Sequence, residues 1–217
     1  MLTFAEEILL LLLDDDGNFI SAPETTIDCA MTGAVLMDLA FAGRIDTDLD
    51  ELRVMDKTPT GDPLQDRILE RISAEPENYN TRDWIDMIRS DEAQDIREHT
   101  LTRLVERGIL EYHEEKLLWV FRTRRYPMID GKAEQEVRTR IIEVLQSDDI
   151  PDPRDIALIC LVEACNLLPG IMPGKTDRHV RERVEDIRKM DLIGREVAGA
   201  VSVIEASIMM SVAQAPN

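Results

Sequence analysis

The chain has 217 residues, with 25 Lys and Arg against 44 Asp and Glu, and its formal net charge is −19. This charge disfavours nucleic acid as a general partner, because such binding depends mainly on attraction between cationic side chains and phosphate. An anionic partner must therefore be met by a local cationic patch. The length can bury one good-sized core and no low-complexity linker divides it, so we expect a single domain over residues 1–217.

The cysteines and the apolar segments favour a cytoplasmic protein. An odd number of cysteines without metal-ligand spacing predicts reduced core residues; these are Cys29, Cys160 and Cys165. The Leu-rich N-terminal stretch has no preceding basic residue, and three aspartates at 14–16 stand where a signal peptide would be cleaved. The most apolar segment, 197–213, is too short to cross a bilayer and predicts a buried core helix.

The first half of the chain carries clear helix signals. Thr3 and Glu6 have the spacing of a capping box, which starts a helix at once. A long helix is predicted over 26–42 and stops at a glycine, and a β-hairpin follows over 44–55. Asp62 and Pro63 then predict the cap and the first residue of another helix. A shorter helix is expected from Thr81, and a separate one is expected to start at Asp91 or Glu92 and to run to a glycine at 108.

The second half predicts more helices. An amphipathic helix is expected over 132–145, and the next begins at Asp152 and is apolar nearly all round, as suits a bundle centre. A rigid Pro-Gly loop over 169–174, a charged surface helix over 177–190 and a core helix over 193–213 complete the chain. The fold class is therefore mainly α, with a central apolar helical bundle surrounded by amphipathic helices and two or more small β-hairpins.

Residues 104–127 gather features that the rest of the chain spreads thinly. Four of the nine aromatic residues lie between 112 and 126. We predict a strand starting at Ile109, a polar turn at 114–116 and a second strand at 117–121. The segment KLLWVFRTRR holds four cations and no acid, namely Lys116, Arg122, Arg124 and Arg125. An aromatic, cationic hairpin on an acidic body indicates an interaction surface.

The order of helix, glycine, strand, turn and strand occurs twice, at 26–55 and at 104–121. One interpretation is an internal duplication of a winged-helix-like unit. The other is that helix-to-hairpin joints commonly use glycine. Under the first interpretation, the protein would be a DNA-binding regulator whose residues 116–125 contact DNA.

Catalytic motifs are missing from the sequence. There is no nucleophile elbow, HExxH, CxxC or GxGxxG pattern. The nearest approach to a phosphate loop, 170–176, has three residues between its glycines instead of four, and Pro173 lacks an N–H for a phosphate. The three histidines have no metal-ligand spacing. We therefore predict a protein that is not an enzyme and uses neither a cofactor nor a metal.

The sequence resembles the Golgi phosphoprotein 3 family over nearly its whole length. The matching stretches are LTFAEEILLLLLDDDG at 2–17, GAVLMDLAFAGRI at 33–45, PTGDPLQDRIL at 59–69, NTRDWIDMI at 80–88, RLVERGIL at 103–110 and DIALICLVEACNLL at 155–168. The resemblance implies a mainly helical, non-enzymatic peripheral membrane protein. It also implies binding of phosphatidylinositol 4-phosphate and, in eukaryotes, retention of glycosyltransferases in the Golgi.

Residue by residue, the resemblance leaves most of the headgroup pocket unmatched. The family's pocket Trp and first Arg fall at Pro23 and Thr32, and its Arg pair falls at Gln94 and Arg97. Only Arg97 matches, so we expect the specific lipid pocket to be largely missing. The basic N-terminal tail of Golgi members is also absent from this sequence, which indicates a prokaryotic-type member.

We therefore expect a peripheral membrane adaptor at the cytoplasmic face of a membrane, attached through the hairpin, whose residues 117–121 fall at the family's membrane-dipping loop. Partners would be an anionic membrane lipid, by resemblance phosphatidylinositol 4-phosphate, and cytoplasmic tails of membrane proteins. The alternative is a soluble oligomeric scaffold that uses the hairpin for subunit contacts in a homo-oligomer. The candidate lipid-binding residues are Arg97, Lys116, Leu117, Trp119, Phe121, Arg122, Arg124 and Arg125.

Overall fold

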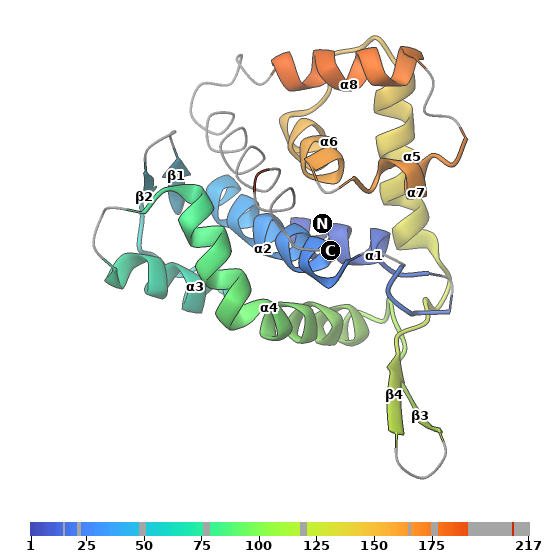
Figure 1. Cartoon of the computed structure of the whole chain (residues 1–217), viewed down its shortest axis with the longest axis horizontal. Coiled ribbons are helices and arrows are strands. Elements are labelled where there is room, and N and C mark those ends of the chain that lie inside the picture. The colour runs from blue at the N-terminus through green and yellow to red at the C-terminus, as the bar shows by residue number, and fades with distance from the viewer. Residues whose placement is uncertain are drawn as a thin grey trace.

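The computed structural model describes residues 1–14, 16–20, 23–47, 51–75, 79–117, 121–164, 166–174, 178–190 and 210. Within these ranges it is mainly helical, with two separate antiparallel hairpins (Figure 1). The elements are α1 (Phe4–Leu11), α2 (Glu24–Phe41), β1 (Ile45–Thr47), β2 (Leu52–Val54), α3 (Pro63–Ala74), α4 (Thr81–Glu106), β3 (His113–Leu117), β4 (Phe121–Arg125), α5 (Lys132–Gln146), α6 (Pro153–Ala164), α7 (Leu168–Ile171) and α8 (Arg178–Met190). The mainly α fold class with two small hairpins is confirmed.

Local capping signals fix where the helices begin. Thr3 accepts a hydrogen bond from the backbone of Glu6 while the Glu6 carboxylate accepts one from the Thr3 backbone, so the predicted capping box is present. Asp62 caps α3 by accepting two backbone N–H groups of its first turn, with Pro63 as the first helical residue. The N-terminus of α1 has a further cap from outside, because Asp38 of α2 accepts the first two N–H groups of α1 at 2.8 and 3.2 Å.

Helix α1 is buried over its full length and packs against α2, α4 and α5. Two of the buried residues of α1 are glutamates, and each forms ion pairs with two arginines from other elements. Glu6 pairs with Arg103 and Arg107 of the α4 end at 3.2 and 2.7 Å. Glu7 pairs with Arg140 of α5 and Arg154 of α6 at 2.9 and 3.2 Å. These four contacts tie the N-terminal helix to the elements that surround it.

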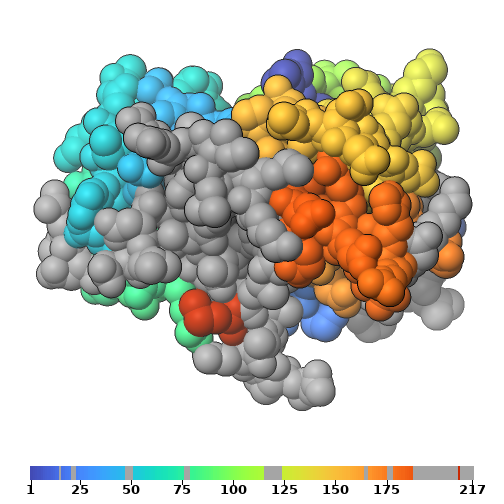
Figure 2. All heavy atoms as spheres, turned by 90° about the horizontal axis from the view of Figure 1, so that it is seen from above, coloured from blue at the N-terminus to red at the C-terminus, as the bar shows by residue number. Residues whose placement is uncertain are grey.

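The C-terminal elements pack around α6, whose residues 157–162 are all fully buried. Helices α5 and α8 lie side by side on the face seen in Figure 2. α8 is not only a charged surface helix, because Val180, Val184 and Ile187 are buried on one side. Its buried Arg183 donates to backbone carbonyls at 144 and 149. Part of the loop expected at 169–174 forms the short helix α7.

One prediction about the helices is wrong. The two helices expected from Thr81 and from Asp91 are a single 26-residue helix, α4. Asp91 and the following Glu92 look like an N-terminal signal, but they serve as partners of α3: Arg71 pairs with them at 2.6 and 2.8 Å. These contacts hold the acidic residues within a continuous helix, where sequence alone suggested a break.

The core helix expected over 193–213 lies outside the described residues except for Met210, whose sulfur accepts from Arg82 at 3.7 Å. Cys29 and Cys160 are buried, as expected, and Cys165 is outside the described residues. In the part of the chain that the structure describes, no helix combines the length and the apolar character needed to cross a bilayer.

Candidate functional site

The β3–β4 hairpin projects from one end of the helical body, beyond the C-terminal end of α4 (Figure 1). Its position in the sequence differs from the prediction. Residues 114–116, expected as the turn, belong to β3, and the strands are joined through 118–120 instead. The strand expected at 117–121 is therefore split between the end of β3 and the start of β4. A polar strand is compatible with a two-stranded ribbon that projects from the body, and His113, Glu114 and Arg124 are exposed.

The register of the hairpin places residues of opposite charge, Glu114 and Arg124, at facing positions near its base, and residues of like charge nearer its far end. Lys116 lies directly opposite Arg122. Such a pair is unfavourable in a hairpin by itself, because cross-strand side chains of like charge repel. Leu117 lies opposite Phe121 and forms the last pair before the connecting residues. The cationic pair and the apolar pair are thus neighbours at the end of the ribbon that points away from the body.

The base of the hairpin is fixed by the loop that follows α1. The backbone N–H of Tyr126 donates to the carbonyl of Gly17 at 3.0 Å. Gly17 has φ +76°, and a Cβ there would lie 2.1 Å from the backbone of Tyr126, so only glycine fits this contact. The ring of Tyr126 lies 5.6 Å from that of Tyr112, and burial raises the pKa of Tyr126. These contacts attach the projecting strands to the N-terminal part of the fold.

A second attachment comes from α4. Arg124 of β4 ion-pairs with Glu98 at 3.2 Å, and Glu98 also accepts from Gln94 at 3.1 Å. All three side chains are exposed. Arg125 is half-buried beside the loop after α1, where backbone donation from Asn18 and, to a smaller extent, the charge of Arg125 lower the pKa of Asp14. The two last arginines of the hairpin thus face acidic residues of the body.

Arg97 lies next to Glu98 on α4 and turns toward α2. It ion-pairs with Glu24 at 3.0 Å and approaches Asp28 at 3.5 Å. Burial raises the pKa of Asp28, and the nearby Arg97 opposes this shift. One guanidinium therefore faces two carboxylates. This arrangement leaves little positive charge at Arg97 for a phosphate group.

The remaining positions that resemble the family's headgroup pocket do not supply a cation. Pro23 is the cap residue of α2 and has no N–H. Thr32 is fully buried in α2, and its hydroxyl has no hydrogen-bond partner among the described residues. Gln94 is exposed and bonded to Glu98. The structure brings Pro23 and Arg97 to the same α2–α4 junction, without a cluster of cations there among the described side chains.

The candidate residues thus fall into separate groups. Arg97 belongs to the α2–α4 junction, Arg124 and Arg125 to the base of the hairpin, and Lys116, Leu117, Phe121 and Arg122 to its strands. Trp119 lies outside the described residues. Sequence reasoning missed Gly17 and Glu98, which hold the hairpin base. For Gly17, the only local signal was its place within the acidic turn at 14–18, which indicates a turn but no contact with the hairpin. For Glu98, no local pattern indicates the ion pair with Arg124.

Two of the histidines have carboxylate neighbours. His99 of α4 lies 3.2 Å from Asp62, and His113 of β3 lies 2.9 Å from Glu111. These pairs stand apart on different elements. Over the ranges that the structure describes, no group of three or more His, Cys, Asp or Glu side chains could hold a metal ion.

Comparison with known proteins gives a family match over most of the chain. Residues 4–204 match the model of the family described as Golgi phosphoprotein 3 (GPP34). The chain is similar to vacuolar protein sorting-associated protein 74 of Eremothecium gossypii, with 26% identity, and to that of Schizosaccharomyces pombe, with 28%. Each alignment covers 79% of this chain and only 61% and 60% of the respective relative. The family match covers nearly all of the sequence, and on this basis the chain belongs to the Golgi phosphoprotein 3 family.

Proposed function

We propose that this protein is a non-enzymatic peripheral membrane adaptor that attaches through the β3–β4 hairpin to the anionic cytoplasmic face of a membrane. The observation that carries the proposal is the cationic pair Lys116 and Arg122 on a ribbon that projects from the body. Cationic residues at facing register positions favour a partner of opposite charge. The family membership supports an adaptor in place of an enzyme.

The composition of the hairpin favours a lipid surface as that partner. Its sequence places an apolar run, residues 117–121, directly beside the cations. Burying a large apolar side chain at an interface contributes about 1.5 to 3 kcal/mol. Each Lys or Arg close to an anionic leaflet contributes about 1 kcal/mol. The sum suits weak and reversible attachment, which a homo-oligomer would strengthen through avidity.

The lipid selectivity should differ from that of family members with a complete headgroup pocket. Arg97 is already paired with Glu24 and lies near Asp28. A monophosphate headgroup at this junction would meet those two carboxylates as well as the single guanidinium. We therefore infer that attachment depends on the negative charge density of the membrane, and that phosphatidylinositol 4-phosphate is not specifically selected.

Liposome flotation tests the proposal. Vesicles of phosphatidylcholine alone, with phosphatidylglycerol, or with phosphatidylinositol 4-phosphate at equal total charge would be compared. We expect flotation with both anionic vesicles to a similar extent and little with the neutral vesicle. Loss of flotation on Trp119→Ala/Phe121→Ala would support the hairpin as the attachment point.

Two results would contradict the proposal. A clear preference for phosphatidylinositol 4-phosphate at equal charge would mean that the α2–α4 junction still forms a headgroup pocket. Absence of flotation, combined with a drop to monomer in light scattering when the hairpin is removed, would instead support a soluble scaffold that uses the hairpin for subunit contacts.

A further inference from the structure

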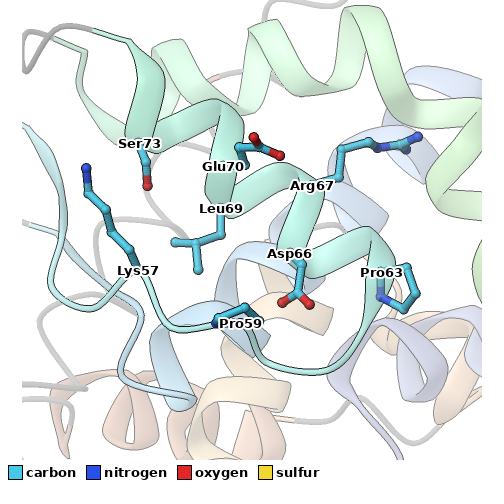
Figure 3. Close-up of a pocket in the computed structure, with 8 residues that line it drawn as sticks. All are labelled: Lys57, Pro59, Pro63, Asp66, Arg67, Leu69, Glu70 and Ser73. Carbon is cyan, nitrogen blue, oxygen red and sulfur yellow. The ribbon is translucent and has the colours of Figure 1, made fainter.

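A surface pocket of about 440 Å³ lies beside α3, on the part of the body between β2 and α4 (Figure 3). It is bordered by the loop 56–62, which contains the PTGD stretch that the hairpin function leaves unused. A ligand of this pocket would bind independently of membrane attachment, because the pocket and the hairpin lie on different elements.

The loop that borders the pocket is held in one conformation by its own side chains. Asp66 accepts from the backbone of Thr60 at 2.6 Å, from its hydroxyl at 2.8 Å and from the backbone of Gly61 at 3.3 Å. Asp56 pairs with Arg44 at 2.7 Å and accepts from the backbone N–H at 58 at 2.9 Å. A loop fixed at both ends forms a preorganised wall, which reduces the entropic cost of binding a ligand.

Two charged groups of the pocket are not used by the fold. Within the described residues Lys57 and Glu70 are both exposed and neither forms an ion pair, whereas the exposed Lys132 pairs with a neighbouring aspartate at 2.6 Å. The other two charged lining residues already have partners in the fold. Asp66 accepts hydrogen bonds from the loop, and Arg67 forms an ion pair with α4. The pocket therefore offers one uncommitted cation and one uncommitted anion.

The hydroxyl of Ser73 also has no hydrogen-bond partner among the described residues. Its oxygen is shielded from solvent. A hydroxyl side chain within a helix can donate to the carbonyl four residues earlier. Thr100 and Thr102 of α4 do so, at 2.8 and 2.7 Å. Ser73 does not, so a donor is left in the pocket wall that a bound acceptor would satisfy.

The polar and apolar lining residues lie at different positions along the pocket. Lys57 and Ser73 lie at one end of the pocket, Leu69 and Pro59 lie along its middle, and Pro63 lies at the other end (Figure 3). An ammonium and a hydroxyl donor together suit a carboxylate. The apolar middle suits an aliphatic side chain attached next to that carboxylate. This combination is the C-terminal residue of a peptide.

We propose that this pocket binds the C-terminal carboxylate of a partner polypeptide whose last residue is aliphatic. Lys57 and Ser73 hold the carboxylate, and Leu69 and Pro59 contact the last side chain. Glu70, which no described cation neutralises, favours a basic residue shortly before the end of the peptide. Capture of a C-terminal carboxylate is a known mode of peptide recognition.

Nuclear magnetic resonance titration of the full chain with acetyl-Arg-Ala-Leu tests the proposal. The probe would be compared with the same peptide carrying a C-terminal amide and with acetyl-leucine. We expect shifts of the backbone signals of residues 57–61 and 69–73 with the free carboxylate. The amide and acetyl-leucine should bind at least about tenfold more weakly, because one lacks the charged hydrogen bonds and the other lacks the basic residue.

Variants sharpen the assignment. Lys57→Gln should weaken binding of the carboxylate peptide about tenfold, and Ser73→Ala should weaken it severalfold. The matched control is Lys132→Gln, which removes an exposed lysine outside the pocket and should leave binding unchanged. The assignment is overturned by equal binding of the amide or of acetyl-leucine, by equal binding to the Lys57→Gln variant, or by no shifts in the pocket at millimolar peptide.

Discussion

Arginines have different neighbours in the helical body and on the β3–β4 hairpin. In the body, Arg140 and Arg154 converge on the buried carboxylate of Glu7. On the hairpin, Arg122 lies opposite another cation, Lys116. The first arrangement satisfies charge inside the protein, and the second places two cationic residues at facing positions on a projecting ribbon.

Under the proposed function, this difference is how an acidic chain would present a cationic surface. Most of the described arginines of the body have carboxylate partners, so they contribute little to the outward potential. The body as a whole stays negative and repels anions. Under the proposed function, attraction to an anionic surface should therefore be concentrated at the hairpin. Substitutions in the two regions should accordingly separate stability from binding.

The largest effect on stability is expected for Glu7→Ala. This change leaves Arg140 and Arg154 facing each other at a partly buried site without their shared carboxylate. We expect the free energy of unfolding to fall by about 3 kcal/mol or more, measured by urea denaturation. Glu70→Ala, an exposed glutamate without a described ion pair, is the control and should change it by less than about 0.5 kcal/mol. Equal effects of the two would refute the role of the buried pairs.

The second-largest loss of stability is expected for Gly17→Ala, which tests how the hairpin is attached to the body. A Cβ at this position would overlap the backbone of Tyr126, and the positive φ adds strain. We expect a loss of about 2 kcal/mol and faster proteolysis within the hairpin. Gly61→Ala is matched, because φ is +90° but nothing lies within 4 Å of the added Cβ. It should cost about 1 kcal/mol and leave the hairpin as resistant as before.

A smaller effect comes from pH. Burial raises the pKa of Asp38 to about 7, although the backbone of Phe4 and Ala5 donates to it. Because the folded pKa lies above the unfolded value of 3.8, the folded state binds more protons between these values. Stability should therefore fall as pH rises from about 4 to 7, by at most about 1.4 kcal/mol per pH unit.

Thermal unfolding of the wild type and of Asp38→Asn across this range measures the effect. The variant should lose most of the pH dependence, since Asn does not titrate. A stability that rises with pH only in the wild type would show that the ionised Asp38 is the preferred form.

Local signals in the sequence predicted much of the fold. Thr3 and Asp62 mark helix starts because a cap needs only residues within one turn. The continuity of α4 was missed because Asp91 is retained by Arg71, twenty residues earlier in the chain. The pairing of Glu7 with two distant arginines was missed for the same reason: no local pattern encodes a long-range ion pair.

The candidate site was predicted only in part. The cationic, aromatic composition located the hairpin, but its turn was placed too early in the chain because Glu114 and Glu115 look like turn residues. The sequence of residues 113–125 has no alternation of apolar and polar residues that would fix the register of the two strands. No sequence motif indicated a ligand pocket beside α3, since Lys57 and Ser73 come together only through the folding of the loop onto the helix.

Liposome binding of two double variants as a function of salt separates the charge of the hairpin from the charge of the body. Lys116→Gln/Arg122→Gln removes the cationic pair of the hairpin. Lys57→Gln/Arg178→Gln removes one lysine and one arginine that are exposed elsewhere. Both variants should unfold within about 0.5 kcal/mol of the wild type.

At low ionic strength, we expect the hairpin variant to lose most of its binding to phosphatidylglycerol vesicles while the control binds as the wild type does. The difference should shrink at high salt, because screening removes the electrostatic part of binding in all three proteins. Equal losses in the two variants would contradict attachment through the hairpin, since they would show that the net charge of the chain governs binding.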